Sequence, residues 1–179
     1  MSASLILICG VSGVGKSTLI DHLVSTNPNI FRLPIYTSRT KRTQNDHKIS
    51  ITSEEITHLT TDPQNIVMNI YDSIYLIKHE DISKSLRNGL IPITDWPFSQ
   101  IHLFNNFNLK TIYLLPPSEK ELENRLKKRG ESEESIKNRT ITDQIELVKM
   151  KSGKNSLNYH VIINNKIEDT VVEITKLLI

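Results

Sequence analysis

Cysteine is nearly absent from this chain of 179 residues, which holds only Cys9. With a single cysteine no internal disulfide can form, and this favours a reducing, cytoplasmic compartment. The six histidines are scattered and lack the spacing of metal ligands. An excess of one charge is missing too. The formal net charge is +2, so the composition gives no reason to expect nucleic-acid binding.

Long apolar runs are missing as well. The longest one near the start is Leu5–Cys9, which is too short for a membrane span or for the apolar part of a signal peptide. No repeat or linker-like stretch interrupts the chain, and its length fits one domain. Apolar residues make up 37% and charged residues 23%, which excludes disordered, collagen-like and low-complexity proteins.

The apolar residues alternate between the strand and helix periods, which is typical of α/β proteins. Leu5–Cys9 is a continuous apolar run that ends at Gly10, as expected of a central strand buried on both faces. Core strands are predicted near residues 5, 33, 91, 112 and 161, separated mostly by helices. We therefore expect an α/β fold, a three-layer sandwich around a five-stranded parallel sheet.

Shorter signals predict the remaining elements. Thr52–Glu55 fits a capping box that opens a helix, and Ile66–Tyr71 and Ile74–Ile77 are expected to form a hairpin. Residues 37–50 are polar and show no pattern, so a loop is expected there. Further helices are predicted up to Asn27, at 79–88 before Gly89, from Pro97 to Asn105, after a second capping box at 118–121, at 131–149 and at 167–178.

A phosphate-binding motif follows the first strand. Residues Gly10–Ser17 match G-x-x-x-x-G-K-[ST] in full, between a predicted strand and helix. Glycines let backbone N–H groups turn toward phosphate oxygens, and the helix N-terminus adds a favourable partial charge. Lys16 is expected to reach the β- and γ-phosphates of ATP, and the Ser17 hydroxyl to ligate Mg²⁺. The alternative is a glycine-rich turn with an incidental lysine. The predicted nucleotide-binding residues are Gly10, Ser12, Gly13, Val14, Gly15, Lys16, Ser17 and Thr18.

A carboxylate, Asp95, follows the apolar run Leu90–Thr94. In phosphate-loop folds a carboxylate at this position holds Mg²⁺ through water or touches the phosphate acceptor. The alternative is a loop or helix-capping carboxylate before Trp96. The sequence leaves both interpretations open.

Two basic clusters suit a reaction between two phosphates, because an anionic acceptor needs cations that offset its repulsion from ATP. Arg39 and Arg42 are three residues apart and could both bind the acceptor phosphate, unless this is only an exposed basic loop. Arg129 and Arg139 are expected to act as lid arginines on the transferred group. The alternative for that second cluster is an exposed helix face with i,i+4 ion pairs.

Three segments together resemble the guanylate kinase family of nucleoside monophosphate kinases: Gly10–Leu19, Thr37–Arg42 and Leu115–Arg139. The resemblance implies ATP-dependent phosphorylation of a monophosphate. It implies a single domain over 1–179, with a core of 1–36 and 79–179, an acceptor-binding insert at about 37–78 and a lid at about 127–145. The implied catalytic residues are Lys16, Arg39, Arg42, Arg129 and Arg139; Arg125 joins the nucleotide site, Ser38, Arg39, Arg42, Asp72, Tyr75 and Asp95 bind the acceptor, and Ser17 and Asp95 hold the metal.

The resemblance is weakest where the family reads the base. The family has a glutamate that reads the guanine N1 and N2 hydrogens, but the corresponding stretch Ile66–Ile70 holds no acid. Of the family's Asn-Tyr-Tyr-Gly-Thr segment, Ser73–Ile77 keeps only Tyr75. Asp72 is the candidate replacement for the missing carboxylate. A site that loses its base-reading groups relaxes or changes its acceptor.

Three hypotheses follow. The first is a phosphotransferase that moves the γ-phosphoryl of ATP to GMP or a related nucleoside monophosphate. The second is a sugar-phosphate kinase similar to the ribose 1,5-bisphosphate phosphokinases, whose acceptor has no base. The third is a non-catalytic guanylate-kinase-like module, against which the intact Lys16 and Ser17 argue. The expected partners are ATP, Mg²⁺ and a small phosphate acceptor, with GMP favoured and neither nucleic acid nor membrane involved; the chain is expected to be a cytoplasmic monomer or homodimer.

Overall fold

The computed structural model describes residues 4–41, 46–70, 72–128, 130, 132–153 and 158–178, except for the side chains at 135, 137–142, 153 and 178. Its central sheet has five parallel strands in the order β2-β7-β1-β8-β9. The predicted sheet is thus confirmed. The strands are β2 (Ile30–Arg32), β7 (Ile91–Asp95), β1 (Leu5–Gly10), β8 (Leu109–Leu115) and β9 (Tyr159–Ile163).

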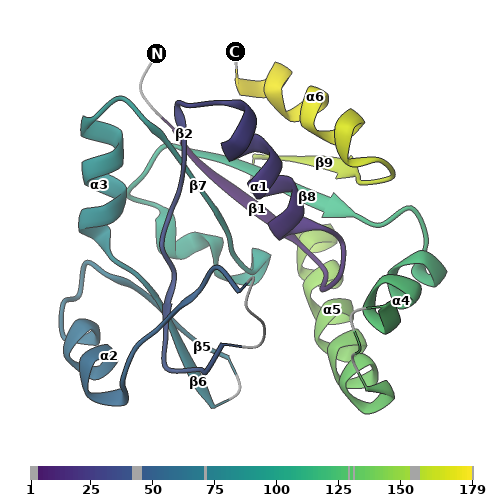
Figure 1. Cartoon of the computed structure of the whole chain (residues 1–179), viewed down its shortest axis with the longest axis horizontal. Coiled ribbons are helices and arrows are strands. Elements are labelled where there is room, and N and C mark those ends of the chain that lie inside the picture. Colours follow the sequence, from purple (N-terminus) through teal and green to yellow (C-terminus); the bar gives the residue numbers. More distant parts are fainter. Residues whose placement is uncertain are drawn as a thin grey trace.

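Helices cover both faces of this sheet, as the predicted three-layer sandwich requires. On one face, Ile6 and Ile8 pack against α1 (Lys16–Thr26) and α6 (Ile167–Leu178), which lie side by side in Figure 1. On the other, Leu5, Leu7 and Cys9 pack toward α3 (His79–Arg87), the 3₁₀ helix η1 (Phe98–Phe104) and α5 (Glu133–Gly153). β1 is therefore buried on both faces, which explains its uninterrupted apolar run.

A second, smaller sheet lies beside the first and has the strand order β4-β3-β6-β5. β5 and β6 form the predicted antiparallel hairpin. Part of the predicted loop at 37–50 is wrong, because β3 and β4 pair there over two residues each. Strands this short carry no alternating pattern that a sequence could reveal. The elements are β3 (Tyr36–Thr37), β4 (Ile49–Ser50), α2 (Ser53–Thr60), β5 (Ile66–Ile70) and β6 (Ser73–Ile77).

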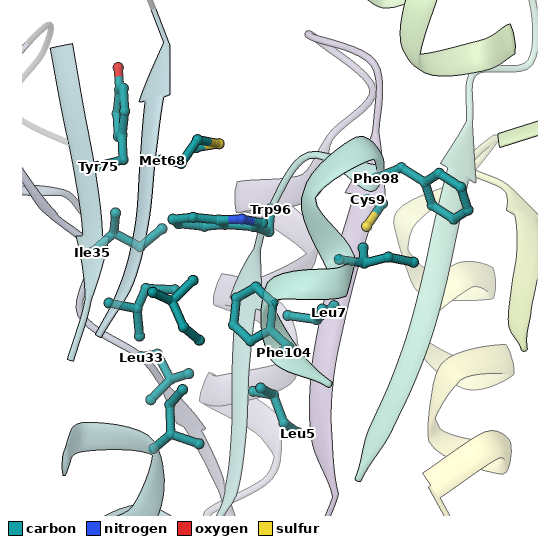
Figure 2. Packing of buried hydrophobic residues seen from close by; sticks show 14 of the residues in the cluster. Leu5, Leu7, Cys9, Leu33, Ile35, Met68, Tyr75, Trp96, Phe98 and Phe104 are labelled. Carbon is teal, nitrogen blue, oxygen red and sulfur yellow. The ribbon is translucent and has the colours of Figure 1, made fainter. Parts of the chain in front are cut away.

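Trp96 joins the two sheets. Its buried ring lies between Ile35, Met68 and Tyr75 on the second sheet and Phe104 of η1 (Figure 2), with the Trp96 and Phe104 rings 5.7 Å apart edge to face. One continuous apolar cluster therefore extends from β1 to the smaller sheet. This packing fixes the position of the smaller sheet against the core.

Two helix predictions need correction. The helix expected from Pro97 to Asn105 is the 3₁₀ helix η1, with Pro97 at its N-cap. Its buried residues Phe98, Ile101 and Phe104 recur every three residues, which is the 3₁₀ period. The helix expected at 131–149 is α5, which begins at Glu133 and continues to Gly153.

The helix ends show how local sequence determines local structure. The predicted capping box at α2 is present: the Thr52 hydroxyl accepts from Glu55 N at 3.1 Å, and Glu55 Oε2 accepts from Thr52 N at 2.8 Å. Ser118 Oγ caps α4 (Glu119–Lys128) by accepting from Glu121 N at 3.1 Å. The Glu121 carboxylate pairs instead with Arg125, four residues later. None of the described helices is long and apolar enough to cross a membrane.

Candidate active site

The phosphate loop connects β1 to α1, and its backbone requires glycine. Gly10 and Gly15 have φ angles of 137° and 104°. A Cβ on Gly15 would lie 2.6 Å from Asn164 Nδ2, and one on Gly10 would lie 2.5 Å from the backbone oxygen of Leu114. These positions combine a left-handed backbone with close neighbours, so a side chain at either one would distort the loop.

Asn164 supports the phosphate loop through a side-chain hydrogen bond, and the sequence analysis did not identify this residue. Its buried Nδ2 donates to Val14 O at 2.7 Å, and its Oδ1 accepts from Thr170 Oγ1 at 3.0 Å. A signal was available, because Asn164 is a polar residue directly after the apolar strand β9. The carboxyl ends of parallel strands are where such folds bind ligands.

The Lys16 ammonium lies at the mouth of the loop. Its Nζ donates to Gly10 O at 2.6 Å and to Val11 O at 2.9 Å. Burial is the main cause that lowers the pKa of Lys16, while the charges of Asp95 and Asp143 oppose this lowering. Two carboxylates thus act on the lysine that the motif assigns to phosphate binding.

Asp143 of α5 places a carboxylate on the loop itself. Its two oxygens lie 3.0 Å and 3.1 Å from Ser12 N and both accept from this backbone group. An anion therefore already occupies a backbone donor that the motif predicts for phosphate, so the loop fits an anionic ligand. Nothing in the sequence pointed to Asp143, because α5 was predicted only as an exposed helix.

The predicted metal ligands lie near the start of α1 and the end of β7. Ser17 is exposed in the first turn of α1, beside Thr18. Asp95 ends β7, where it is paired in register with Ile8 of β1. Hydroxyl and carboxylate oxygens suit Mg²⁺. In the described part of the chain, no group of three or more His, Cys, Asp or Glu side chains forms a metal site.

Arg125 contacts the phosphate loop from α4. Its Nη1 lies 3.5 Å from Val14 O, and its Nε donates to Glu121 Oε1 at 3.0 Å. The sequence analysis assigned Arg125 to the nucleotide site. The structure places this guanidinium against the loop backbone.

A second group of predicted site residues lies on the smaller sheet, around Arg39. The Arg39 guanidinium donates to Asp46 Oδ2 at 2.6 Å and to Tyr75 Oη at 3.1 Å. Burial alone would lower the pKa of Arg39, but the contacts with Asp46 and Tyr75 outweigh it and raise the pKa. Ser38 Oγ accepts from Ile74 N at 3.0 Å, which joins β3 to β6 beside this group. Three predicted acceptor residues, Ser38, Arg39 and Tyr75, thus lie together.

A cavity of about 530 Å³ connects the phosphate loop with the smaller sheet. Glu146 of α5 lies on its wall and accepts from Ser99 N at 3.0 Å, which ties α5 to η1. The lining combines the loop, one face of the smaller sheet, the segment after β7 and one side of α5. These residues are Gly10, Ser12, Lys16, Ile35, Lys48, Met68, Asn69, Ile70, Tyr75, Asp95, Trp96, Pro97, Ser99, Gln100, Asp143, Ile145, Glu146 and Lys149.

Several predicted residues do not line the cavity, among them Ser38 and Arg39, although Arg39 contacts the lining residue Tyr75. Asp72 is exposed in the turn between β5 and β6 and does not line the cavity. Arg42 and Arg129 fall outside the described residues, and Arg139 lies on α5 with its side chain outside the description. The predicted lid, about 127–145, corresponds to the end of α4 and the first part of α5.

Comparison with known proteins decides the family. A family model described as guanylate kinase matches residues 2–179. The chain belongs to the guanylate kinase family. It is 34% identical to a guanylate kinase of Mycoplasmoides gallisepticum over 185 residues, which cover 98% of this chain and 91% of that protein. A guanylate kinase of Wolbachia sp. subsp. Brugia malayi is 29% identical, with 97% and 91% covered. A crystal structure of guanylate kinase from Anaplasma phagocytophilum shares the fold, with a TM-score of 0.73 at 19% identity, covering 99% of this chain and 86% of that one.

β5 forms part of the wall of the cavity. The stretch Ile66–Ile70 contributes Met68, Asn69 and Ile70 to the lining. Asn69 offers a neutral amide, within the stretch where the resemblance implies a carboxylate and the sequence holds none. Gln100, after β7, supplies the second amide of the described lining.

Proposed function

We propose that this chain transfers the γ-phosphoryl group of ATP to GMP or a related nucleoside monophosphate. The observation that carries the proposal is the single cavity that reaches from Lys16 of the phosphate loop to Tyr75 of the smaller sheet. A phosphoryl-transfer enzyme must hold donor and acceptor in line in one water-excluding space. Family membership favours this activity over a sugar-phosphate acceptor and over a non-catalytic module.

The donor end binds ATP. The loop N–H groups, with Ser12 among them, donate to phosphate oxygens in place of the Asp143 carboxylate, and Lys16 turns from its carbonyl partners to the β- and γ-phosphates. Ser17 and Asp95 are the residues that would hold Mg²⁺ with phosphate oxygens. The ion, when bound, offsets charge on the β- and γ-phosphates.

The acceptor end binds the monophosphate. Tyr75 and Asp46 orient the Arg39 guanidinium. A guanidinium can bind a phosphate through two parallel hydrogen bonds. Residues 37–78 thus serve as the acceptor lobe. Asn69 and Gln100 are the candidate base-reading groups, since their amides can both donate and accept.

The transfer itself needs no general base. An acceptor phosphate oxygen attacks the γ-phosphorus, the bond from that phosphorus to the β–γ bridging oxygen breaks, and ADP leaves. The nucleophile is already an anionic oxygen, so no proton has to move. Positioning and charge compensation therefore carry the catalysis, and closure of the segment 127–145 over the cavity excludes water.

The test is ADP release from ATP and Mg²⁺ with GMP, dGMP, AMP, UMP, CMP, dTMP and ribose 1,5-bisphosphate as acceptors. We expect turnover with GMP or another monophosphate from this set. Turnover with ribose 1,5-bisphosphate alone would replace the proposal by the sugar-phosphate activity. Binding of ATP without turnover of any acceptor would favour a non-catalytic module.

A further inference from the structure

Among the charged groups that line the cavity, two lysines have no side-chain hydrogen bond to another described residue: Lys48, which is partly buried, and Lys149, which is exposed on α5. Lys16, Asp143 and Glu146 are each held by hydrogen bonds of 3.1 Å or less. Lys48 Nζ has one ion-pair partner among the described residues, Asp95, whose Oδ2 lies 3.8 Å away. That distance exceeds a hydrogen bond, so the three donor hydrogens of this ammonium are available to a ligand in the cavity.

Lys48 reaches from the smaller sheet to the core. It directly precedes β4, and its backbone N donates to Asp46 Oδ1 at 3.2 Å, on the carboxylate that also pairs with Arg39. Its side-chain partner Asp95 ends β7 beside β1, close to where the phosphate loop begins. The backbone of Lys48 is therefore joined to the group around Arg39, while its ammonium lies beside Asp95 at the core end of the cavity.

Electrostatics agree with this position between the two ends. Burial is the main cause that lowers the pKa of Lys16, and the positive charge of Lys48 adds to the lowering. The two ammonium groups therefore act on one another across the cavity. Like charges that face one shared space are stabilised when an anion enters between them.

We propose that Lys48 leaves Asp95 when substrates bind and donates to the acceptor phosphate on the side that faces the γ-phosphate. This inference rests on the proposed function. As the acceptor oxygen bonds to the γ-phosphorus and the bond to the β–γ bridging oxygen breaks, negative charge from two phosphates meets in one place. Lysine is a compact point charge that suits such a position, and it would add a third cation to Lys16 and Arg39.

A purely structural role explains the contact less well. The Lys48 and Asp95 side chains remain 25% and 20% exposed, and no hydrogen bond joins them. Pairs of this kind contribute little to stability. A weak ion pair of this kind lets the lysine leave Asp95 and bind the substrate.

The experiment compares wild type with Lys48→Met, using ATP, Mg²⁺ and GMP or whichever acceptor the panel identifies. We expect kcat/KM for the acceptor to fall about 100-fold. ATP affinity, measured by calorimetry without acceptor, should change by less than about threefold. Lys48→Arg keeps the charge and should retain much of the activity that Lys48→Met loses. A role of the aliphatic stem alone would not predict this difference between the two variants. Lys84→Met, on the outer side of α3, removes the same charge away from the cavity and is the matched control.

The outcomes separate this inference from the proposed function. Wild-type kcat/KM in Lys48→Met, with the wild type active, would overturn the role of Lys48 and leave the proposed function standing. An equal loss of ATP affinity would also overturn it, because Lys48 would then belong to the donor end. A wild type that turns over no acceptor would overturn both. Lys48→Gln, which keeps a polar side chain, repeats the test if the methionine variant does not fold.

Discussion

The donor and acceptor ends of the cavity are built in different ways. At the donor end, one continuous segment, Gly10–Ser17, supplies the backbone donors and the lysine. At the acceptor end, Arg39 follows β3, Tyr75 belongs to β6 and Lys48 precedes β4. In the proposed function, a motif thus makes the donor site, and the pairing of short strands makes the acceptor site.

Both ends hold an internal carboxylate, but the two carboxylates differ in origin. Asp143 lies 131 residues from its partner Ser12, on a separate helix, and accepts from a backbone N–H that the motif predicts for phosphate. Asp46 lies seven residues from Arg39, and its pair with Arg39 is largely buried, with 12% and 14% of the side chains exposed. We infer that Asp143 gives way to phosphate, whereas Asp46 remains as part of the acceptor site.

The largest expected effect is at the donor end. Lys16→Ala should lower kcat by about 10³-fold, because the reaction loses the cation on the transferring group. The fold should persist, since the hydrogen bonds of Lys16 Nζ to described residues go to loop carbonyls and its burial as a charge is unfavourable. Steady-state ADP release and a thermal melt measure both quantities. Turnover at the wild-type rate would mean that the loop does not perform the chemistry.

The difference between the ends also explains what the sequence could predict. The phosphate loop, the strand before it and the hairpin of the smaller sheet follow from local patterns, and the structure contains them. Arg39 was predicted from its basic cluster, Ser38 and Tyr75 through the family resemblance, and the three lie together. The ligands that the motif and the resemblance assign to these residues remain predictions.

The residues that sequence analysis missed come from elements that meet only in three dimensions. Asp143, Lys48 and Glu146 are ordinary charged residues in polar stretches, and no spacing relates them to the loop. Two-residue strands such as β3 and β4 have no period, so the position of Lys48 could not be deduced. Asn164 is the exception, because a polar residue after a buried parallel strand is a recognisable signal.

Arg39→Lys sharpens the comparison at the acceptor end. It keeps a positive charge beside Asp46, so the buried carboxylate stays paired, but it removes the planar guanidinium. The acceptor KM should rise about 30-fold, while the ATP KM should stay within about threefold of wild type. Initial rates with each substrate varied in turn provide both constants. An equal rise in the two constants would show that Arg39 does not belong to a separate acceptor site.

The two internal carboxylates give the next prediction. Asp143→Asn removes the negative charge that competes with phosphate at Ser12 N, so ATP should bind about tenfold more tightly. Asp46→Asn should have the opposite sign at the other end: it loosens Arg39, and the acceptor should bind about tenfold more weakly. Calorimetry with each ligand alone measures these affinities.

Each variant serves as the control for the other. Asp143→Asn should leave acceptor affinity unchanged, and Asp46→Asn should leave ATP affinity unchanged. If Asp143→Asn instead weakens ATP binding, the carboxylate assists the nucleotide rather than competing with it. The inference that Asp143 leaves its partner when substrate binds, while Asp46 stays, would then be wrong.

The smallest effect of a ligand or a variant, no change at all, is expected at Cys9 of β1. Cys9 is fully buried near Phe98 of η1 (Figure 2), in a cluster that also holds Met150 of α5. Burial raises the pKa of the Cys9 thiol, Lys16 opposes this, and the carboxylates of Glu146 and Asp95 add to it. The folded state therefore favours the neutral thiol. The stability that this provides is present below the ordinary thiol pKa of about 8.5 and declines as the pH rises above it.

Alkylation by iodoacetamide at pH 8.5 should accordingly be at least about 100-fold slower in the native protein than in urea, because the thiolate is the reactive form. Mass spectrometry of timed samples measures the rate, and neither ATP nor Asp143→Asn should change it. The test bears on how the donor end opens, since Met150 and Asp143 lie on the same helix. If only the part of α5 around Asp143 moves, the part around Met150, which shares the apolar cluster with Cys9, stays in place. Rapid labelling in Asp143→Asn would show instead that the whole helix moves, and that the donor end is no more preformed than the acceptor end.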